Sequence, residues 1–164
     1  MKAKILKEFN MSKFRRLSAE ELSIFENEFI NFLVVNGVDA NEWEKIKKDN
    51  VEKADKMVDI FSDFVFEKVI NETEFLMFRS PKYIQCVHCQ PNQMFMVAIS
   101  SINEDYDLTQ YQITALDMSK VEFYKGEKKY QQDRTAELFE MMNKGFQKTD
   151  GTLYKQLLMI SVSE

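Results

Sequence analysis

The chain has 164 residues, of which 45% are hydrophobic, 30% charged and 13% aromatic, which is typical of one globular domain and excludes fibrous, low-complexity and disordered classes. Its four glycines, one histidine and two cysteines exclude most catalytic motifs that depend on glycine-rich loops, histidine pairs or thiolate clusters. The net charge of −5 argues against binding of a polyanion by the body of the protein.

Charge is unevenly distributed along the chain. Residues 1–16 form an N-terminal arm with a net charge of +5, whereas residues 17–164 carry a net charge of −10. The basic side chains of the arm are Lys2, Lys4, Lys7, Lys13, Arg15 and Arg16. The arm is interpreted either as a solvated terminus or as a segment that docks on an acidic surface, an RNA or a membrane. Binding of nucleic acid is expected only through this arm.

No hydrophobic segment predicts export or membrane insertion. Residues 1–10 carry frequent charges, and the longest apolar runs, 32–35 and 94–99, are far shorter than a membrane span of about 18 residues. The sequence therefore predicts a cytoplasmic protein without a membrane partner, in which Cys86 and Cys89 are reduced.

Helix-capping signals divide the first half of the chain into three predicted helices. Capping boxes open them at Ser18 with Glu21, Asp39 with Glu42, and Asp49 with Glu52. The predicted helices span residues 19–36, 40–48 and 51–71. Gly37 follows the first helix at the position where a left-handed residue ends a helix. The third helix has the broadest apolar face, and we expect it to be the buried scaffold.

Beyond Glu72 the hydrophobic pattern changes to that of strands. Strands are predicted over residues 73–79, 83–89, 93–101 and 121–124. The turn at Pro91-Asn92 predicts a hairpin, so at least part of the sheet is expected to be antiparallel. A short helix is expected within 109–118, and further helices from 131 or 133 to Gly145 and over 153–160.

These elements predict a single compact α+β domain over residues 17–164. Its expected parts are an N-terminal three-helix segment, a small and mostly antiparallel central sheet, and C-terminal helices. No linker rich in proline, glycine or serine divides the chain, and no internal repeat recurs.

The N-terminal half of the sequence resembles a known family. The string FRRLSAEEL at Phe14–Leu22 matches the F-R-R-L-[ST]-x-E-[EQ]-L opening of a Bacteroidetes family of small proteins known as a domain of unknown function. The resemblance continues through Glu42-Trp43, Phe61-Ser62-Asp63, Glu67, Ser80-Pro81-Lys82 and Asp150-Gly151-Thr152-Leu153, and it covers about residues 13–157. It implies a cytoplasmic role in such a bacterium, or in a phage of one, and it carries no assigned activity.

The string Cys86-Val87-His88-Cys89 is the most suggestive of chemistry. A redox pair of this spacing needs its first thiol at a helix N-terminus, whereas a turn signal follows here. A structural zinc site needs about four ligands in separated pairs, and no second ligand cluster occurs in the sequence. We interpret these residues as two strand cysteines and a structural histidine. Metal bridging in an oligomer and redox chemistry are the alternatives.

Carboxylate pairs offer the remaining candidates for catalysis. Glu42 and Glu67 would suit an acid–base pair, and Asp59 and Asp63 lie one helical turn apart, where two carboxylates share a cation or a proton. Chance pairs are expected among 27 acids, so solvated helix faces are the simpler interpretation. The acidic loop 103–107 lacks the glycine and the terminal glutamate of a calcium loop. The sequence predicts no metal or cofactor and assigns no catalytic residue.

Hydrophobic residues outside the main helical stripes predict a binding surface. Ile60, Phe66 and Ile70 are its candidates beside the basic arm, and they suit contact with another protein or self-association. The favoured hypothesis is a non-enzymatic interaction module. An RNA- or ribosome-associated factor that uses the arm and exposed rings such as Tyr83 and Tyr124 is the first alternative. A hydrolase with a carboxylate or metal site is the second.

Overall fold

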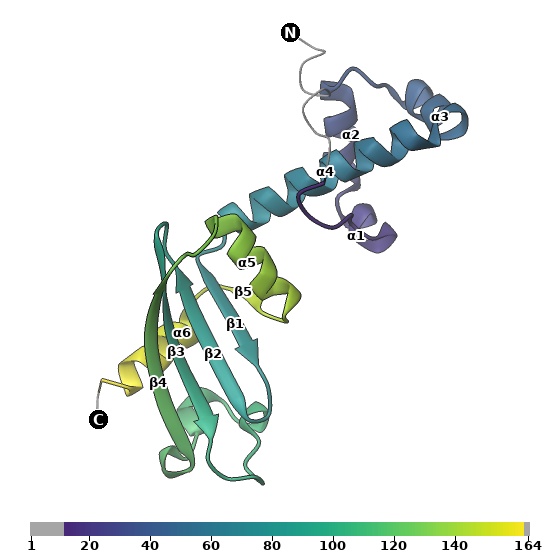
Figure 1. The fold of residues 1–164 in the computed structure, drawn as a ribbon. Coiled ribbons are helices and arrows are strands. Elements are labelled where there is room, and N and C mark those ends of the chain that lie inside the picture. The colour runs from purple at the N-terminus through teal and green to yellow at the C-terminus, as the bar shows by residue number, and fades with distance from the viewer. Residues whose placement is uncertain (1–11, 163–164) are drawn as a thin grey trace. The chain divides into compact units, whose positions relative to one another are not determined.

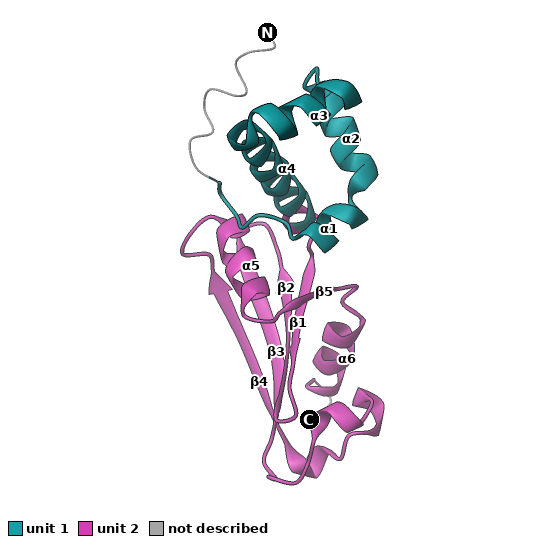
Figure 2. Ribbon diagram, turned by 90° about the vertical axis from the view of Figure 1, so that its right-hand side faces the viewer, with its two compact units in different colours: residues 1–69 teal, residues 70–164 magenta. Residues whose placement is uncertain are grey.

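The computed structural model describes residues 12–162, which fold into two compact units (Figures 1 and 2). Unit 1 ends at Val69 and unit 2 begins at Ile70. The predicted α+β class is confirmed, because helices come first, a five-stranded antiparallel sheet follows, and further helices come before and after its last strand. The predicted boundaries, an arm over 1–16 and a domain over 17–164, stay a prediction. None of the described helices combines the length and apolar character that a membrane span requires.

The first described helices begin close to the predicted caps. They are α1 (Ala19–Ile24), α2 (Glu26–Val35), α3 (Ala40–Asp49) and α4 (Val51–Asn71). Ser18 and Glu21 form the predicted capping box, in which each side chain accepts the backbone N–H of the other residue. Asp39 caps α3, as predicted. Asn50 rather than Asp49 caps α4, because α3 extends through Asp49 and Asn50 Oδ1 accepts an N–H in the first turn of α4.

The prediction of one continuous helix over 19–36 is wrong. The chain turns at Phe25 and forms two helices, α1 and α2, in this range. The Phe25 N–H is shared between the carbonyls of Glu21 and Leu22, so the last turn of α1 tightens and a new helix begins. The turn keeps Leu22 and Phe25 in the same hydrophobic cluster as Phe29. Burial of these side chains therefore continues across the break.

Aromatic rings fill the core of unit 1. Phe29 lies edge-on to Trp43 at 5.3 Å between ring centroids. Phe61 packs against Phe29 and Phe32 at 5.0 and 5.5 Å. Phe61 lies on α4 and is fully buried, as expected for the helix that the sequence identifies as the scaffold.

Unit 2 is built on an antiparallel sheet with the strand order β4-β3-β2-β1-β5 (Figure 1). The strands are β1 (Phe75–Arg79), β2 (Tyr83–Cys89), β3 (Gln93–Ser101), β4 (Val121–Lys129) and β5 (Gln147–Thr149). The predicted hairpin between β2 and β3 is confirmed. β4 extends to Lys129 rather than to residue 124, since Gly126 pairs with Met96 and does not end the strand. β5 is too short and polar for its pattern to indicate a strand.

Helices cover the two faces of this sheet differently. α5 (Arg134–Asn143) and α6 (Thr152–Ile160) lie on opposite faces (Figures 1 and 2). Under α6 lies the main core, where Ile84, Val97 and Leu157 are fully buried. The opposite face, which we call the groove face, carries the cross-strand row Leu76, Val87, Met96 and Gly126.

The short helix predicted within 109–118 is of the 3-10 type. The chain between β3 and β4 forms three short 3-10 turns, at Leu108–Gln110, Ile113–Ala115 and Met118–Lys120. Asp107 and Asp117 begin two of these turns by accepting the N–H two residues later, and such local bonds compete with an α-helix. The turns direct Leu108 and Ile113 into the core under α6.

Arg134 connects the ends of several elements of unit 2. Its guanidinium donates to the carbonyls of Ile70, Thr73, Cys89 and Gln90, and its bond to Thr73 is 2.6 Å long. These carbonyls belong to the end of α4, the approach to β1, the end of β2 and the turn after it. Because Arg134 is the first residue of α5, these bonds fix the start of α5 against the sheet.

Replacing Gly151 by alanine should destabilise unit 2 more than replacing Gly145. Both glycines have positive φ, 80° and 99°. A Cβ at Gly151 would lie 2.6 Å from the Phe75 ring, whereas one at Gly145 would touch Phe78 at 3.4 Å. We expect losses in the free energy of unfolding of about 3 kcal/mol for Gly151→Ala and about 1 kcal/mol for Gly145→Ala. Urea unfolding measures both, and equal losses would contradict the clash with Phe75.

Candidate functional site

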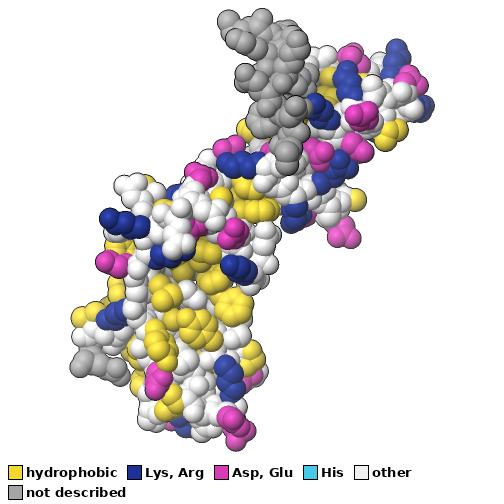
Figure 3. Space-filling model, viewed as in Figure 1, with side chains coloured by type: hydrophobic (Ala, Val, Ile, Leu, Met, Phe, Trp, Pro, Cys, Tyr) yellow, Lys and Arg dark blue, Asp and Glu magenta, His cyan; other side chains and the backbone are white. Residues whose placement is uncertain are grey.

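A groove lies between α5 and the groove face of the sheet, entirely within unit 2. It encloses about 370 Å³. Its floor is formed by Val87 of β2 and by Met94 and Met96 of β3, while Met141 of α5 and Phe146 line its side. Figure 3 shows hydrophobic side chains gathered on the face of the sheet seen in Figure 1. The groove is therefore an apolar hollow on a sheet face that α5 covers only in part.

Because Gly126 of β4 has no side chain, the groove is open toward this edge of the sheet. A Cβ at this position would lie 3.3 Å from the Cε of Met96, so any side chain here would compete with Met96 for space. Gly126 does not have a positive φ, so ordinary strand backbone suits it and its lack of a side chain is what matters. A glycine inside a strand pattern indicates a close approach of another group.

Methionine gives the floor of the groove an adaptable surface. Met94 is buried and Met96 half-buried, and the side-chain amide of Gln85 donates to the sulfur of Met96. Methionine is unbranched and polarisable, so it fits side chains of different shape. The floor therefore suits apolar side chains without demanding one shape.

Glu137 of α5 holds a buried charge at the edge of the groove. It is 6% exposed and accepts hydrogen bonds from Lys128 Nζ at 2.7 Å and from the N–H groups of Gln131 and Gln132. Burial raises the pKa of Glu137, but the bonds from Lys128 and the two amides outweigh it and leave the pKa below its ordinary value. Glu137 is therefore a charged carboxylate that ties α5 to β4, not a proton donor.

The side chains that line the groove are mostly apolar or charged. The charged ones include Glu137, which is bound to Lys128, and also Glu140 and Lys144. The sequence does not single out Met94, Met96 or Met141, because only the fold brings β3 and α5 together. The sequence pattern ends the predicted strand at residue 124, so Gly126 indicates a site only once the structure places it inside β4.

The cysteine string lies in β2, which confirms its prediction as a strand. Cys86 and Cys89 are buried free thiols, and burial raises their pKa values to about 12 and about 11. His88 stacks on Phe75 at 4.5 Å and lies edge-on to Tyr154 at 5.7 Å between ring centroids. Among residues 12–162, no group of three histidine, cysteine or acidic side chains is arranged to hold a metal ion.

Both thiols should resist alkylation in the folded protein. With pKa values raised to about 12 and about 11, the reactive thiolate is scarce at pH 8, and burial blocks access. Iodoacetamide at pH 8 should therefore modify Cys86 and Cys89 at least about 100-fold more slowly in buffer than in urea, as followed by mass spectrometry. Rapid modification of either thiol in the native protein would support the redox alternative.

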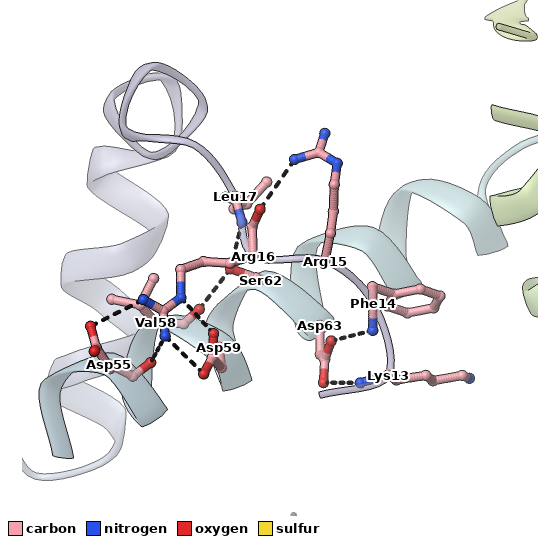
Figure 4. A network of polar contacts seen from close by, with 10 residues as sticks. All are labelled: Lys13, Phe14, Arg15, Arg16, Leu17, Asp55, Val58, Asp59, Ser62 and Asp63. Carbon is pink, nitrogen blue, oxygen red and sulfur yellow. Dashed lines mark hydrogen bonds and ion pairs between the residues drawn. The ribbon is translucent and has the colours of Figure 1, made fainter. Parts of the chain in front are cut away.

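Part of the basic arm lies against α4 in unit 1 (Figure 4). Asp63 accepts the N–H groups of Lys13 and Phe14 at 2.8 Å each. The hydroxyl of Ser62 accepts the N–H of Leu17 at 3.0 Å and donates to a carbonyl one turn earlier. The two strings that carry the family resemblance, around Phe14 and around Phe61, are thus in direct contact.

The arginines of the arm form ion pairs within unit 1. Arg16 binds Asp59 at 2.6 Å and Asp55 at 3.1 Å, and Arg15 binds Glu21 at 2.6 Å. Lys13 lies 3.8 Å from a carboxylate oxygen of Glu67. Of the other predicted basic residues, Lys2, Lys4 and Lys7 lie outside the described residues.

The predicted carboxylate pairs have separate partners. Asp59 binds Arg16, whereas Asp63 binds two backbone amides. Glu67 faces Lys13, and Glu42 contributes its backbone N–H to the cap of α3. The carboxylates of Asp59, Asp63 and Glu67 thus bind groups of the arm, whereas Glu42 takes part in the cap only through its backbone.

The three predicted apolar residues differ in exposure. Ile70 is fully buried and belongs to the core, while Ile60 and Phe66 are half-buried. The Arg15 guanidinium lies 4.8 Å from the Phe66 ring centroid, and the Phe14 ring lies at 5.8 Å. Phe66 is therefore partly covered by the arm, and these residues do not line the groove of unit 2.

Removing residues 1–12 should leave unit 1 folded, whereas removing residues 1–17 should destabilise it. The longer deletion takes away the amides bound by Asp63 and Ser62 and the buried side chain of Leu17. It should cost about 3–5 kcal/mol, because a buried carboxylate loses its donors and a cavity forms. Thermal unfolding followed by helical circular dichroism compares the two deletions. Unfolding by the shorter deletion would contradict the interpretation of residues 1–12 as an accessory arm.

The comparison with known proteins supports the family resemblance of the sequence. Neither a curated protein nor a solved structure matches the chain significantly. One family model, described as a family of unknown function (DUF6495), matches residues 11–161. This match includes the arm contacts of unit 1 and the whole sheet of unit 2. Because it covers more than half of the chain, the protein belongs to the family of unknown function DUF6495.

Proposed function

We propose that this protein is a non-enzymatic, cytoplasmic protein-binding module and that the groove of unit 2 is its binding site. The observation that carries the proposal is the apolar hollow floored by Met94 and Met96 and opened by Gly126. Grooves of this kind bury a few apolar side chains of a partner, which provide most of the binding energy. Exposed apolar surfaces with adaptable methionines are typical of such contacts.

The charges around the groove favour a protein over a nucleic acid. The residues that line it carry charges of both signs, Glu137 and Glu140 as well as Lys128 and Lys144. A nucleic-acid backbone needs a cluster of basic side chains without neighbouring acids. Mixed charge is instead usual at the rim of a protein interface.

The aromatic rings proposed for RNA stacking lie on the groove face. Tyr124 is 43% exposed, and its hydroxyl donates to Glu122 at 2.6 Å. Tyr83 is half-buried two strands away, in the cross-strand row that ends at Glu122. The Glu122 carboxylate would repel a phosphate beside these rings, so they support an apolar protein contact better than RNA stacking.

Filling the groove should abolish binding without unfolding the protein. The probe is a random peptide library displayed on phage, from which peptides that bind the wild-type chain are selected and synthesised. Gly126→Leu fills the hollow beside Met96 and adds strand propensity, so we expect a Kd at least about tenfold higher with stability unchanged or higher. Gly126→Ala should weaken binding by a smaller factor.

The matched control is Met159→Ser on α6. Met159 is 73% exposed and does not line the groove, so its loss should change the Kd by less than about twofold. Peptides that bind Gly126→Leu as tightly as the wild type would overturn the proposal. Failure to select any peptide dependent on the groove would also count against it.

A further inference from the structure

β4 is an edge strand, and it borders the groove. It pairs with β3 on one side, and among the described residues no strand pairs with it on the other. Residues 124–129 are all exposed. Edge strands of this kind present unpaired N–H and C=O groups on which an additional strand can form.

The hydrogen bonds of the structure identify which residues of β4 direct their backbone groups outward. The Ile102 N–H donates to the Lys120 carbonyl at 3.0 Å, so the backbone groups of Lys120 point toward β3. Antiparallel strands alternate between residues that face the partner and residues that face away. The backbone N–H and C=O groups therefore point toward β3 at Glu122, Tyr124, Gly126 and Lys128. They point to the free edge at Phe123, Lys125 and Glu127.

Gly126 connects this edge with the groove. Its side-chain position lies on the groove face, in the row of Met96 and Val87. On an antiparallel strand added to β4, the residue opposite Gly126 would form a pair without mutual hydrogen bonds, in which side chains lie closest. The side chain of that residue would lie next to the hollow above Met96.

We propose that the partner binds as an additional antiparallel strand on β4, with an apolar side chain opposite Gly126 entering the groove. This inference rests on the proposed function and specifies its binding mode. The occupant is an extended peptide segment of another protein. Main-chain hydrogen bonds to Phe123, Lys125 and Glu127 would supply part of the affinity, and the groove would select the side chain.

Charge on the other face of β4 specifies the rest of the partner segment. Lys125 and Lys129 lie on the face opposite the groove, with Glu127 between them. Acidic side chains opposite these lysines would form favourable cross-strand pairs. The segment should therefore alternate apolar residues, which face the groove, with acidic or polar residues.

The same lysines argue against a second copy of the chain as the occupant. Antiparallel pairing of two β4 strands about Lys125 would place this lysine opposite its own copy, and like charges directly opposite are destabilising. Pairing about Gly126 would place Lys125 opposite Glu127, but it would put a glycine opposite Gly126 and so offer no side chain to the groove. Lysines on an edge strand also prevent unselective strand pairing. An acidic side chain opposite Lys125 or Lys129 meets neither obstacle.

The test compares Lys125→Pro with Lys125→Ala. Both variants remove the lysine charge and its hydrogen bond to the Ser161 carbonyl. Only proline also removes the outward N–H, and it does so without removing a bond between β3 and β4. The probe is a synthetic peptide of the length of β4 that alternates valine with glutamate, with glutamine in place of the glutamate opposite Glu127. We expect Lys125→Pro to raise its Kd at least about tenfold above that of Lys125→Ala.

A second measurement uses the wild-type protein, so it does not depend on whether Lys125→Pro folds. One peptide is N-methylated at the residues whose N–H groups would face β4, and its matched control is N-methylated at the alternate residues. Only the first should lose binding. The unmethylated peptide should also slow hydrogen exchange of the Phe123, Lys125 and Glu127 amides, as measured by NMR.

The outcomes separate the binding mode from the proposed function. Equal Kd values for Lys125→Pro and Lys125→Ala, with equal loss for the two methylated peptides, would overturn strand addition. If Gly126→Leu still abolished binding in that case, the groove would remain the site. Insensitivity to both Gly126→Leu and Lys125→Pro would overturn both. A dimer of the wild-type chain that Lys125→Pro dissociates would identify a second copy as the occupant and overturn the peptide proposal.

Discussion

The position of α5 in unit 2 depends on the guanidinium of Arg134. Four backbone carbonyls from separate parts of the chain accept hydrogen bonds from this one side chain. A planar, always charged group with several donors suits this task, whereas a lysine ammonium would not reach carbonyls in so many directions. Two of these carbonyls have a second donor, since Ile70 also accepts the Thr73 N–H and Gln90 the Tyr130 hydroxyl, so Arg134 joins bonds that already connect these segments.

The groove follows from this constraint. Arg134 fixes the first turn of α5 beside the ends of β1 and β2, and Glu137, one turn later, binds Lys128 of β4. Held at these two points, α5 stands over the groove face while leaving Gly126 exposed and Met96 half-buried. A groove whose sides are fixed before a partner arrives loses little conformational freedom on binding, which favours affinity.

Local signals in the sequence predict much of the fold but little of the site. Ser18 and Asp39 act as caps where expected, and β2 and β3 have the predicted bounds, because these features depend on neighbouring residues. The break at Phe25 carries no glycine or proline, so nothing local marks it. β5 is held in place by pairing with β1, which the sequence of β5 does not reveal.

Contacts between distant residues explain why the site itself could not be predicted. In the sequence, the spacing of Asp59 and Asp63 resembles that of a catalytic pair. The structure shows that Asp63 instead accepts the N–H groups of residues 13 and 14, while Asp59 binds Arg16. Met96 and Met141 meet only because α5 returns to the sheet after β4. The strand prediction for Cys86 and Cys89 succeeds because alternation alone specifies it, and burial then accounts for their protonated state.

The hydrogen bond between Ile102 and Lys120 has a consequence for how relatives of this chain can vary in length. It closes the loop of residues 103–119 and sets the pairing of β3 with β4 at its first step. Insertions inside the loop would leave that pairing intact, since loops tolerate added length at small entropic cost. A single residue lost between Lys120 and Gly126 would reverse both the direction of every later amide and the face of every later side chain. Gly126 would then leave the groove face and a charged residue would take its place, so the interval from 120 to 126 is the part of the chain where length must stay constant.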